Sequence, residues 1–155
     1  MKLLVDTSVW SLALRRKNAV SLNPDEQKLK AELVQAIQDG RVAMLGLLRQ
    51  ELLSGIKEKA QFDKVKAALN PYLDEPINTA DHEYAARVYN ECRSHGVEGG
   101  TVDILICAFV VRRGWEVLSG DGGLNRCLAV TKKFHEKQKR TPATEEVKTR
   151  RASRK

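Results

Sequence analysis

The sequence predicts an α/β fold in which a short parallel sheet is covered by helices on both faces. Short apolar runs alternate with longer helical patterns along the chain, which is typical of parallel sheets. The runs are apolar throughout, as expected for strands that are buried on both faces. With 155 residues, of which 42% are hydrophobic, the chain is expected to form one domain with a sizeable core.

Helix signals dominate the first half of the chain. The stretch NPDE at residues 23–26 combines an N-cap residue, a proline at the first helical position and a glutamate at the third. Leucine and isoleucine recur every four positions after it, and Gly40 ends the pattern. The elements expected in this half are strands at 2–5, 42–45 and 75–78, and helices at 8–16, 24–39, 48–54 and 60–69.

The second half contains the most apolar segment of the chain. Thr79 is expected to cap a helix, and three glycines at 96, 99 and 100 predict a loop before the apolar helix. Gly114 separates that helix from a buried strand that ends at SGDGG. The elements expected here are helices at 79–93, 101–112 and 124–128, and strands at 115–118 and 129–130.

The positive charge is concentrated at the C-terminal end. Residues 131–155 hold ten Lys and Arg against three Glu, so their net charge of +7 equals that of the whole chain. This segment has too few apolar residues to fold alone, so we expect a basic, disordered tail. Two interpretations of the tail are open, an arm that binds nucleic-acid phosphates and a solubilising extension.

Cysteine usage and hydropathy indicate a cytoplasmic protein. The three cysteines are far apart and form no CxxC pair, which predicts reduced, buried thiols rather than a disulfide framework or a zinc site. No apolar run reaches the ~18 residues of a membrane span, and the N-terminal pattern is too short for a signal peptide.

Four acidic residues interrupt apolar surroundings. Asp6 follows the first expected strand, and Asp121 follows the strand expected at 115–118. In a parallel sheet the carboxyl ends of the strands meet at one edge, where ligands bind. Glu51 lies in a leucine-rich helix and Asp103 in the first turn of the apolar helix, so both can face that edge.

Each acid also has a structural interpretation. Asp6 can cap the following helix, and Asp121 can belong to a turn. Glu51 can lie on the polar side of its helix, and the helix dipole favours an acid at the position of Asp103. The four acids together predict a divalent-cation site instead, because converging carboxylates repel one another and oxygen ligands suit Mg²⁺ or Mn²⁺. Such sites hydrolyse phosphodiesters.

Other catalytic chemistries fit the sequence poorly. The three histidines, His82, His95 and His135, lie on helical or basic segments without a nucleophile partner. The chain contains no GxSxG, Walker loop, HExxH or GxGxxG motif. A phosphatase-like pair of aspartates is excluded because Ser8 occupies the position of the second acid.

Four segments, taken in order, resemble those of a known family. VDTSVW near the start, QELLSG in the middle, and then GTVDILICAFVV and VLSGD resemble the PIN-domain nucleases. Their order and the chain length resemble most the VapC-type toxins of bacterial and archaeal toxin–antitoxin systems. The resemblance covers residues 1–130, and it implies a PIN-like three-layer α/β/α sandwich with a short parallel central sheet over that range.

The resemblance also implies an activity and a set of partners. The implied activity is that of an endoribonuclease that depends on Mg²⁺ or Mn²⁺, and the implied partners are an RNA substrate, a cognate antitoxin and a second copy of the chain. The residues that it implies are the catalytic and metal-binding acids Asp6, Glu51, Asp103 and Asp121, with Thr7 and Ser119 as supporting hydroxyls.

The sequence departs from the family pattern in its last motif. The family often continues this motif with a second Asp and a Phe, whereas this chain has Gly123 and Leu124. The position of Ser119 is more often Thr in the family. These departures concern the last acidic position and a second metal ion.

Basic residues near the predicted site, and two rival functions, complete the expectations. One rival is a non-catalytic RNA-binding protein that uses the basic tail, and the other is a DNA or structure-specific nuclease. For Arg112 and Arg113 the alternative is a solvated helix end. The candidate RNA contacts are Arg49, Arg112, Arg113, Lys132 and Lys133.

Overall fold

The protein is an α/β structure with a three-stranded parallel sheet. The computed structural model describes residues 1–14 and 21–152, with side chains in that range up to residue 140. The central strand β1 (Leu3–Val5) pairs with β2 (Val42–Ala43) on one side and with β3 (Glu116–Leu118) on the other. The expectation of an α/β fold with a short parallel sheet is therefore confirmed.

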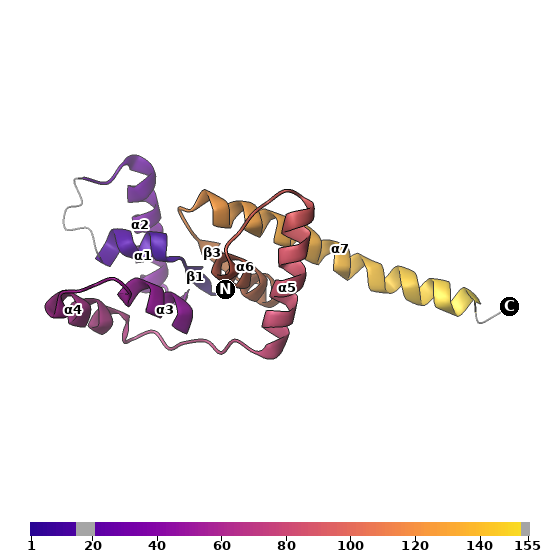
Figure 1. Ribbon diagram of the computed structural model, residues 1–155, viewed down its shortest axis with the longest axis horizontal. Helices are drawn as coiled ribbons and strands as arrows, with labels where there is room; N and C mark the ends of the chain where they lie inside the picture. Colours follow the sequence, from indigo (N-terminus) through magenta and orange to yellow (C-terminus); the bar gives the residue numbers. More distant parts are fainter. Residues whose placement is uncertain (15–20, 153–155) are drawn as a thin grey trace.

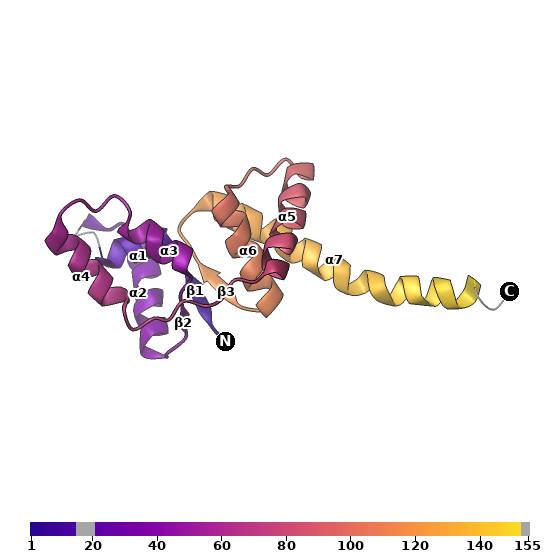
Figure 2. The same ribbon diagram turned by 60° about the horizontal axis from the view of Figure 1, so that its bottom comes forward.

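The sheet lies between two groups of helices (Figures 1 and 2). The central strand is buried, with Leu4 and Val5 at 0% exposure, because helices cover both of its faces. One group is α1 (Thr7–Leu14), α2 (Pro24–Gln38), α3 (Gly46–Leu53) and α4 (Lys59–Leu69). The other group is α5 (Thr79–Ser94), α6 (Thr101–Arg113) and α7 (Gly122–Ala152).

Two helices show how local signals set the element boundaries. At the start of α2 the Asn23 side chain accepts from the Glu26 amide, and the Glu26 side chain accepts from the Asn23 amide, so the predicted capping box is confirmed. Helix α6 is buried at every position from 104 to 111. It ends at Gly114, which has a left-handed backbone with φ 67° that favours glycine.

The segment expected as a strand at 75–78 forms no strand. Met44 and Asp74 make an isolated parallel bridge, and the Glu75 amide donates to the Met44 carbonyl at 2.8 Å. Pro76 follows directly and has no amide hydrogen to continue the ladder. The next helix, α5, is capped by Asn78 rather than by Thr79, through a capping box with Asp81.

The C-terminal part of the structure differs most from the sequence-based expectation. Residues 129–130, expected as a strand, and residues 131–152, expected as a disordered tail, belong to the single helix α7. The part of the helix just after residue 130 packs on α5: the rings of Phe134 and Tyr84 stack at 6.0 Å between centroids, and His135 Nδ1 lies 3.2 Å from the Tyr84 hydroxyl. Figures 1 and 2 show the far end of α7 leading away from the sheet.

The three cysteines lie in the core between α5, α6 and α7. Cys92, Cys107 and Cys127 are free and buried, as expected from the sequence. Burial raises the pKa of all three thiols, that of Cys92 to about 11. Each thiol therefore stays protonated at neutral pH.

Within the described residues, no helix combines the length and the apolar character that crossing a membrane requires. The last two residues of the helix expected at 8–16 lie outside the described residues.

Candidate functional site

Asp6 is the most buried acid at the carboxyl edge of the sheet. Its amide donates to the Leu118 carbonyl at 2.9 Å, so the end of β1 is fixed beside the end of β3. Its side-chain Oδ2 accepts from the Ser8 hydroxyl at 2.8 Å and from the Ser119 hydroxyl at 2.9 Å. The carboxylate, in a residue only 6% exposed, is thus held by two hydroxyls that come from different strand ends.

Ser119 links Asp6 to Asp121. Its hydroxyl donates to Asp6 and accepts from the Asp121 amide at 3.0 Å. Ser8 makes a parallel link, because its hydroxyl donates to Asp6 and accepts from the Gly120 amide at 3.1 Å. The loop after β3 is therefore bound to the start of α1 through one carboxylate.

Asp121 has two structural tasks at the start of α7. Its Oδ1 accepts from the Gly123 amide at 2.8 Å, and its carbonyl accepts from the Asn125 amide at 3.1 Å. This arrangement satisfies a donor in the first turn of α7. The turn interpretation of Asp121 and its place at the site are thus both compatible with the structure.

Glu51 approaches the same edge from α3. Its helix buries Leu48 and Leu52 and leaves the glutamate exposed. The Thr7 hydroxyl donates to Glu51 Oε1 at 3.2 Å. Since Thr7 directly follows Asp6, this bond brings the exposed side of α3 to the end of β1.

Asp103 brings α6 into the group. Burial raises the pKa of its carboxyl above the ordinary value. Negative charges raise it further, in the order Asp121, Asp6 and Glu51. The acids that follow β1, belong to α3 and precede α7 therefore lie close enough to Asp103 on α6 to disfavour its charge.

The donor set suits a divalent cation. All four side chains offer carboxylate oxygens, which Mg²⁺ and Mn²⁺ prefer, and a cation would relieve the repulsion that raises the pKa of Asp103. In the range that the structure describes, no three His, Cys, Asp or Glu side chains are positioned to hold a metal ion. The acids thus lie near one another without being closed into a ligand set.

The three candidate arginines have partners inside the protein. Arg49 donates to Asp74 Oδ1 at 3.0 Å and to the carbonyls of Leu69 and Tyr72. Arg112 and Arg113 both donate to Asp81, at 2.6 and 2.8 Å. Asp81 thus engages both arginines, although Arg112 stays exposed at the end of α6, and the choice between a solvated helix end and an RNA contact stays a prediction.

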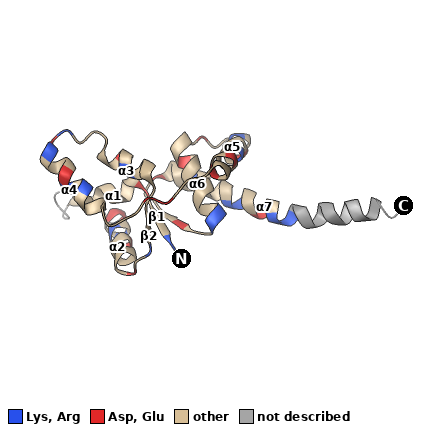
Figure 3. Ribbon diagram, turned by 90° about the horizontal axis from the view of Figure 1, so that it is seen from below, with Lys and Arg blue, Asp and Glu red and all other residues tan. Residues whose placement is uncertain are grey.

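Lys132 and Lys133 are exposed on α7. Figure 3 shows further Lys and Arg along the described part of this helix. These two lysines therefore remain available for a nucleic-acid backbone.

Two residues with clear roles were missed in the sequence. Ser8 fixes Asp6, and the signal was its position two residues after the acid, where a hydroxyl can reach back. Asp81 is 0% exposed, and hydrogen bonds from Arg113 are the first cause that lowers its pKa to about 2. Its signal was the spacing of three from Asn78, which is typical of a capping box.

Comparison with known proteins adds no assignment, because no model of a protein family and no curated protein matches the chain. The chemistry of this site has to be inferred from its own geometry.

Proposed function

We propose that the protein is a divalent-metal-dependent endoribonuclease with a PIN-like fold. The observation that carries the proposal is the gathering of Asp6, Glu51, Asp103 and Asp121 at the carboxyl ends of the strands, where parallel α/β sheets bind ligands. Carboxylates brought together against their own repulsion are more typical of a cation site than of a purely structural cluster.

The residues of the chain would share the work as follows. Asp6, Glu51 and Asp103 would hold Mg²⁺ or Mn²⁺, and Asp121 would complete the group. When bound, the cation would lower the pKa of a water molecule and offset charge on the phosphate. The hydroxyls of Ser8 and Ser119 fix Asp6 Oδ2, and that of Thr7 fixes Glu51 Oε1, so the acids are oriented before substrate arrives.

The reaction would be hydrolysis of an RNA phosphodiester. Water attacks the phosphorus in line, the bond to the 3′-oxygen breaks, and that oxygen leaves with a proton. The products carry a 5′-phosphate and a 3′-hydroxyl, as the resemblance to PIN-domain nucleases suggests.

Cleavage of total RNA by the purified protein tests this proposal. We expect discrete fragments with Mg²⁺ or Mn²⁺ and none with EDTA. Asp6→Asn or Asp103→Asn should lower the rate by about 100-fold or more, a loss typical of removing one group from an electrostatic site. Asp63→Asn, which changes an exposed acid of α4, is the matched control. Full activity in the folded Asp6 variant would overturn the assignment.

The resemblance adds a biological role to the proposal. The protein would act as the toxin of a toxin–antitoxin system, as a homodimer, with an antitoxin that covers the acidic site. Expression without the antitoxin should then arrest growth, and the Asp6→Asn variant should not. Size-exclusion chromatography with light scattering would give the mass of the purified protein and test whether it is a homodimer.

A non-catalytic RNA-binding protein is the second candidate, and the basic helix α7 favours it. Replacing Lys132 and Lys133 by Gln separates the two functions. A binding protein should lose most of its RNA affinity and much of its salt dependence. A nuclease should keep metal-dependent cleavage at reduced affinity.

A further inference from the structure

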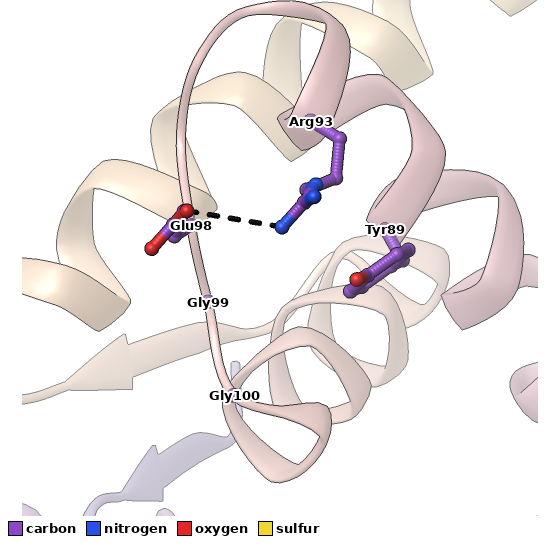
Figure 4. Close-up of a pocket in the computed structure, with 5 residues that line it drawn as sticks. All are labelled: Tyr89, Arg93, Glu98, Gly99 and Gly100. Atoms are coloured by element: carbon purple, nitrogen blue, oxygen red, sulfur yellow. Dashed lines mark ion pairs between the residues drawn. The ribbon is translucent and has the colours of Figure 1, made fainter.

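A pocket lies between the C-terminal half of α5 and the loop that leads into α6. It has a volume of about 350 Å³ and is lined by Tyr89, Arg93, Glu98, Gly99 and Gly100. This volume lies in the range of sites for small ligands, about 300–1,000 Å³. Figure 4 shows Tyr89 and Arg93 extending from α5 toward the glycine segment, with Arg93 paired to Glu98.

The pocket adjoins the acidic site. Gly100 is the N-cap of α6, and Asp103 lies in the first turn of the same helix. A Cβ atom at Gly100 would lie 4.0 Å from Asp103 Oδ2. A ligand group against Gly100 would therefore lie next to one of the four proposed metal-binding acids.

The wall formed by the glycines is bare backbone. A Cβ atom at Gly99 would come within 2.5 Å of Cys127 Sγ and 3.2 Å of Ile104 Cγ1, so the packing behind the loop requires glycine there. No side chain caps the α6 N-terminus. The wall can therefore offer peptide groups to a ligand without a side chain in between.

The opposite wall offers an aromatic face. Tyr89 is 42% exposed, and the Arg93 guanidinium lies 5.8 Å from its ring centroid. Exposed aromatic rings and guanidinium planes are the surfaces on which proteins stack unpaired bases. The Glu98 carboxylate, 3.8 Å from Arg93, can accept hydrogen bonds from base amino and imino groups.

We infer that this pocket binds the base of an unpaired ribonucleotide beside the scissile phosphate, with Tyr89 stacking on the base and Glu98 contacting its edge. This inference rests on the proposed nuclease function and adds the location of a base-binding subsite. The subsite favours the bases that carry an exocyclic amino donor, which are adenine, guanine and cytosine, over uracil.

Binding of short RNA by fluorescence anisotropy in EDTA tests the pocket without cleavage. The probes are a labelled nine-nucleotide oligouridine and the same strand with a central G or C. We expect the G and C strands to bind more tightly. Tyr89→Ala should weaken their binding about tenfold, within the range found for lost base stacking, while Tyr89→Phe should keep it. Glu98→Gln should reduce the preference over uracil.

Controls and kinetics separate this inference from the function itself. Asn90→Ala, an exposed neighbour on α5, should bind like the wild type. With cleavable RNA, Tyr89→Ala should raise KM about tenfold and change kcat little. If the wild type cleaves RNA and Tyr89→Ala changes neither KM nor affinity, the pocket assignment is overturned and the nuclease function stands. Tyr89-dependent binding without any cleavage would support the pocket and overturn the nuclease.

Discussion

Asp81 shows how a single buried charge is stabilised in this protein. It is 0% exposed, and both Arg112 and Arg113 donate to it. It also accepts from the Asn78 amide. One carboxylate therefore joins the start of α5 to the end of α6, and its loss should be felt by both helices.

We expect Asp81→Asn to destabilise the fold at neutral pH. The pKa of Asp81 is lowered from 3.8 to about 2, so its contribution to stability is present above pH 3.8 and is lost as pH falls toward 2. The shift corresponds to about 2 kcal/mol. Urea unfolding of both proteins at pH 7 and near pH 2.5 would measure it. If the difference in unfolding free energy between the wild type and Asp81→Asn does not shrink in acid, this account is contradicted.

Asp103→Asn should have the opposite effect on stability in metal-free buffer. Because the folded pKa of Asp103 is raised, its charge opposes folding, and this penalty builds up as pH rises from the ordinary value of 3.8 to the folded pKa. The variant should therefore melt at a higher temperature than the wild type at pH 7 with EDTA, and the difference should shrink below pH 4. A lower melting temperature would instead mean that the helix-dipole contribution is larger.

At the residue scale, the placement of the four acids near one edge could be predicted because strand ends and helix starts are visible in the sequence. Asp6 and Asp121 follow apolar runs, and the structure places both at the same sheet edge. The partners of Arg112 and Arg113 could not be predicted, since they depend on how α5 and α6 pack. For the same reason Tyr89 had no signal that set it apart from other helical aromatics.

The loop between α5 and α6 shows how an element boundary depends on packing. Gly99 lies against Cys127 and Ile104, and a Cβ atom there would be 2.5 Å from Cys127 Sγ. Both neighbours are in the core, so they have little room to move.

Gly99→Ala should therefore cost about 1–3 kcal/mol, the usual cost of overpacking a core. Differential scanning calorimetry would show the fall in melting temperature. Adding Cys127→Ala to the glycine variant should restore part of the loss, because it removes the atom that clashes. Gly122→Ala is the matched control, because an added Cβ atom there would meet only the Arg126 side chain. Gly40→Ala is unsuitable, because Gly40 has a left-handed backbone with φ 66°.

At the element scale, helices with capping signals were predictable and the shortest strands were not. The capping box of α2 marks its start in the sequence and in the structure. Residues 129–130 are apolar enough for a strand, but Leu124, Cys127 and Thr131 continue a helical spacing whose buried positions face the core. The helical pattern is hard to recognise after residue 131, because the sequence there is mostly charged. Phe134, which stacks on Tyr84 of α5, is one of its few apolar residues.

The whole molecule places its site between its two groups of helices. Glu51 comes from the group that contains α1–α4, whereas Asp103 and Asp121 come from α6 and the start of α7 on the other side (Figure 1). A cation held by these acids would therefore join the two sides of the sheet.

Binding of Mn²⁺ should accordingly raise the melting temperature of the entire fold. At 100 times its dissociation constant a ligand specific for the native state adds about 2.7 kcal/mol. We expect EDTA to reverse the shift and Asp6→Asn to abolish it, in a thermal melt followed by circular dichroism. An equal shift in the Asp6 variant would place the ion elsewhere.

The three buried thiols make the native chain suitable for site-directed labelling. Maleimides and related reagents attack through the thiolate, and burial keeps Cys92, Cys107 and Cys127 protonated and covered. One cysteine introduced at an exposed position, such as Glu83→Cys on α5, should then be modified alone. Fluorophores or spin probes can thus be attached to report on bound RNA while the wild-type core is kept.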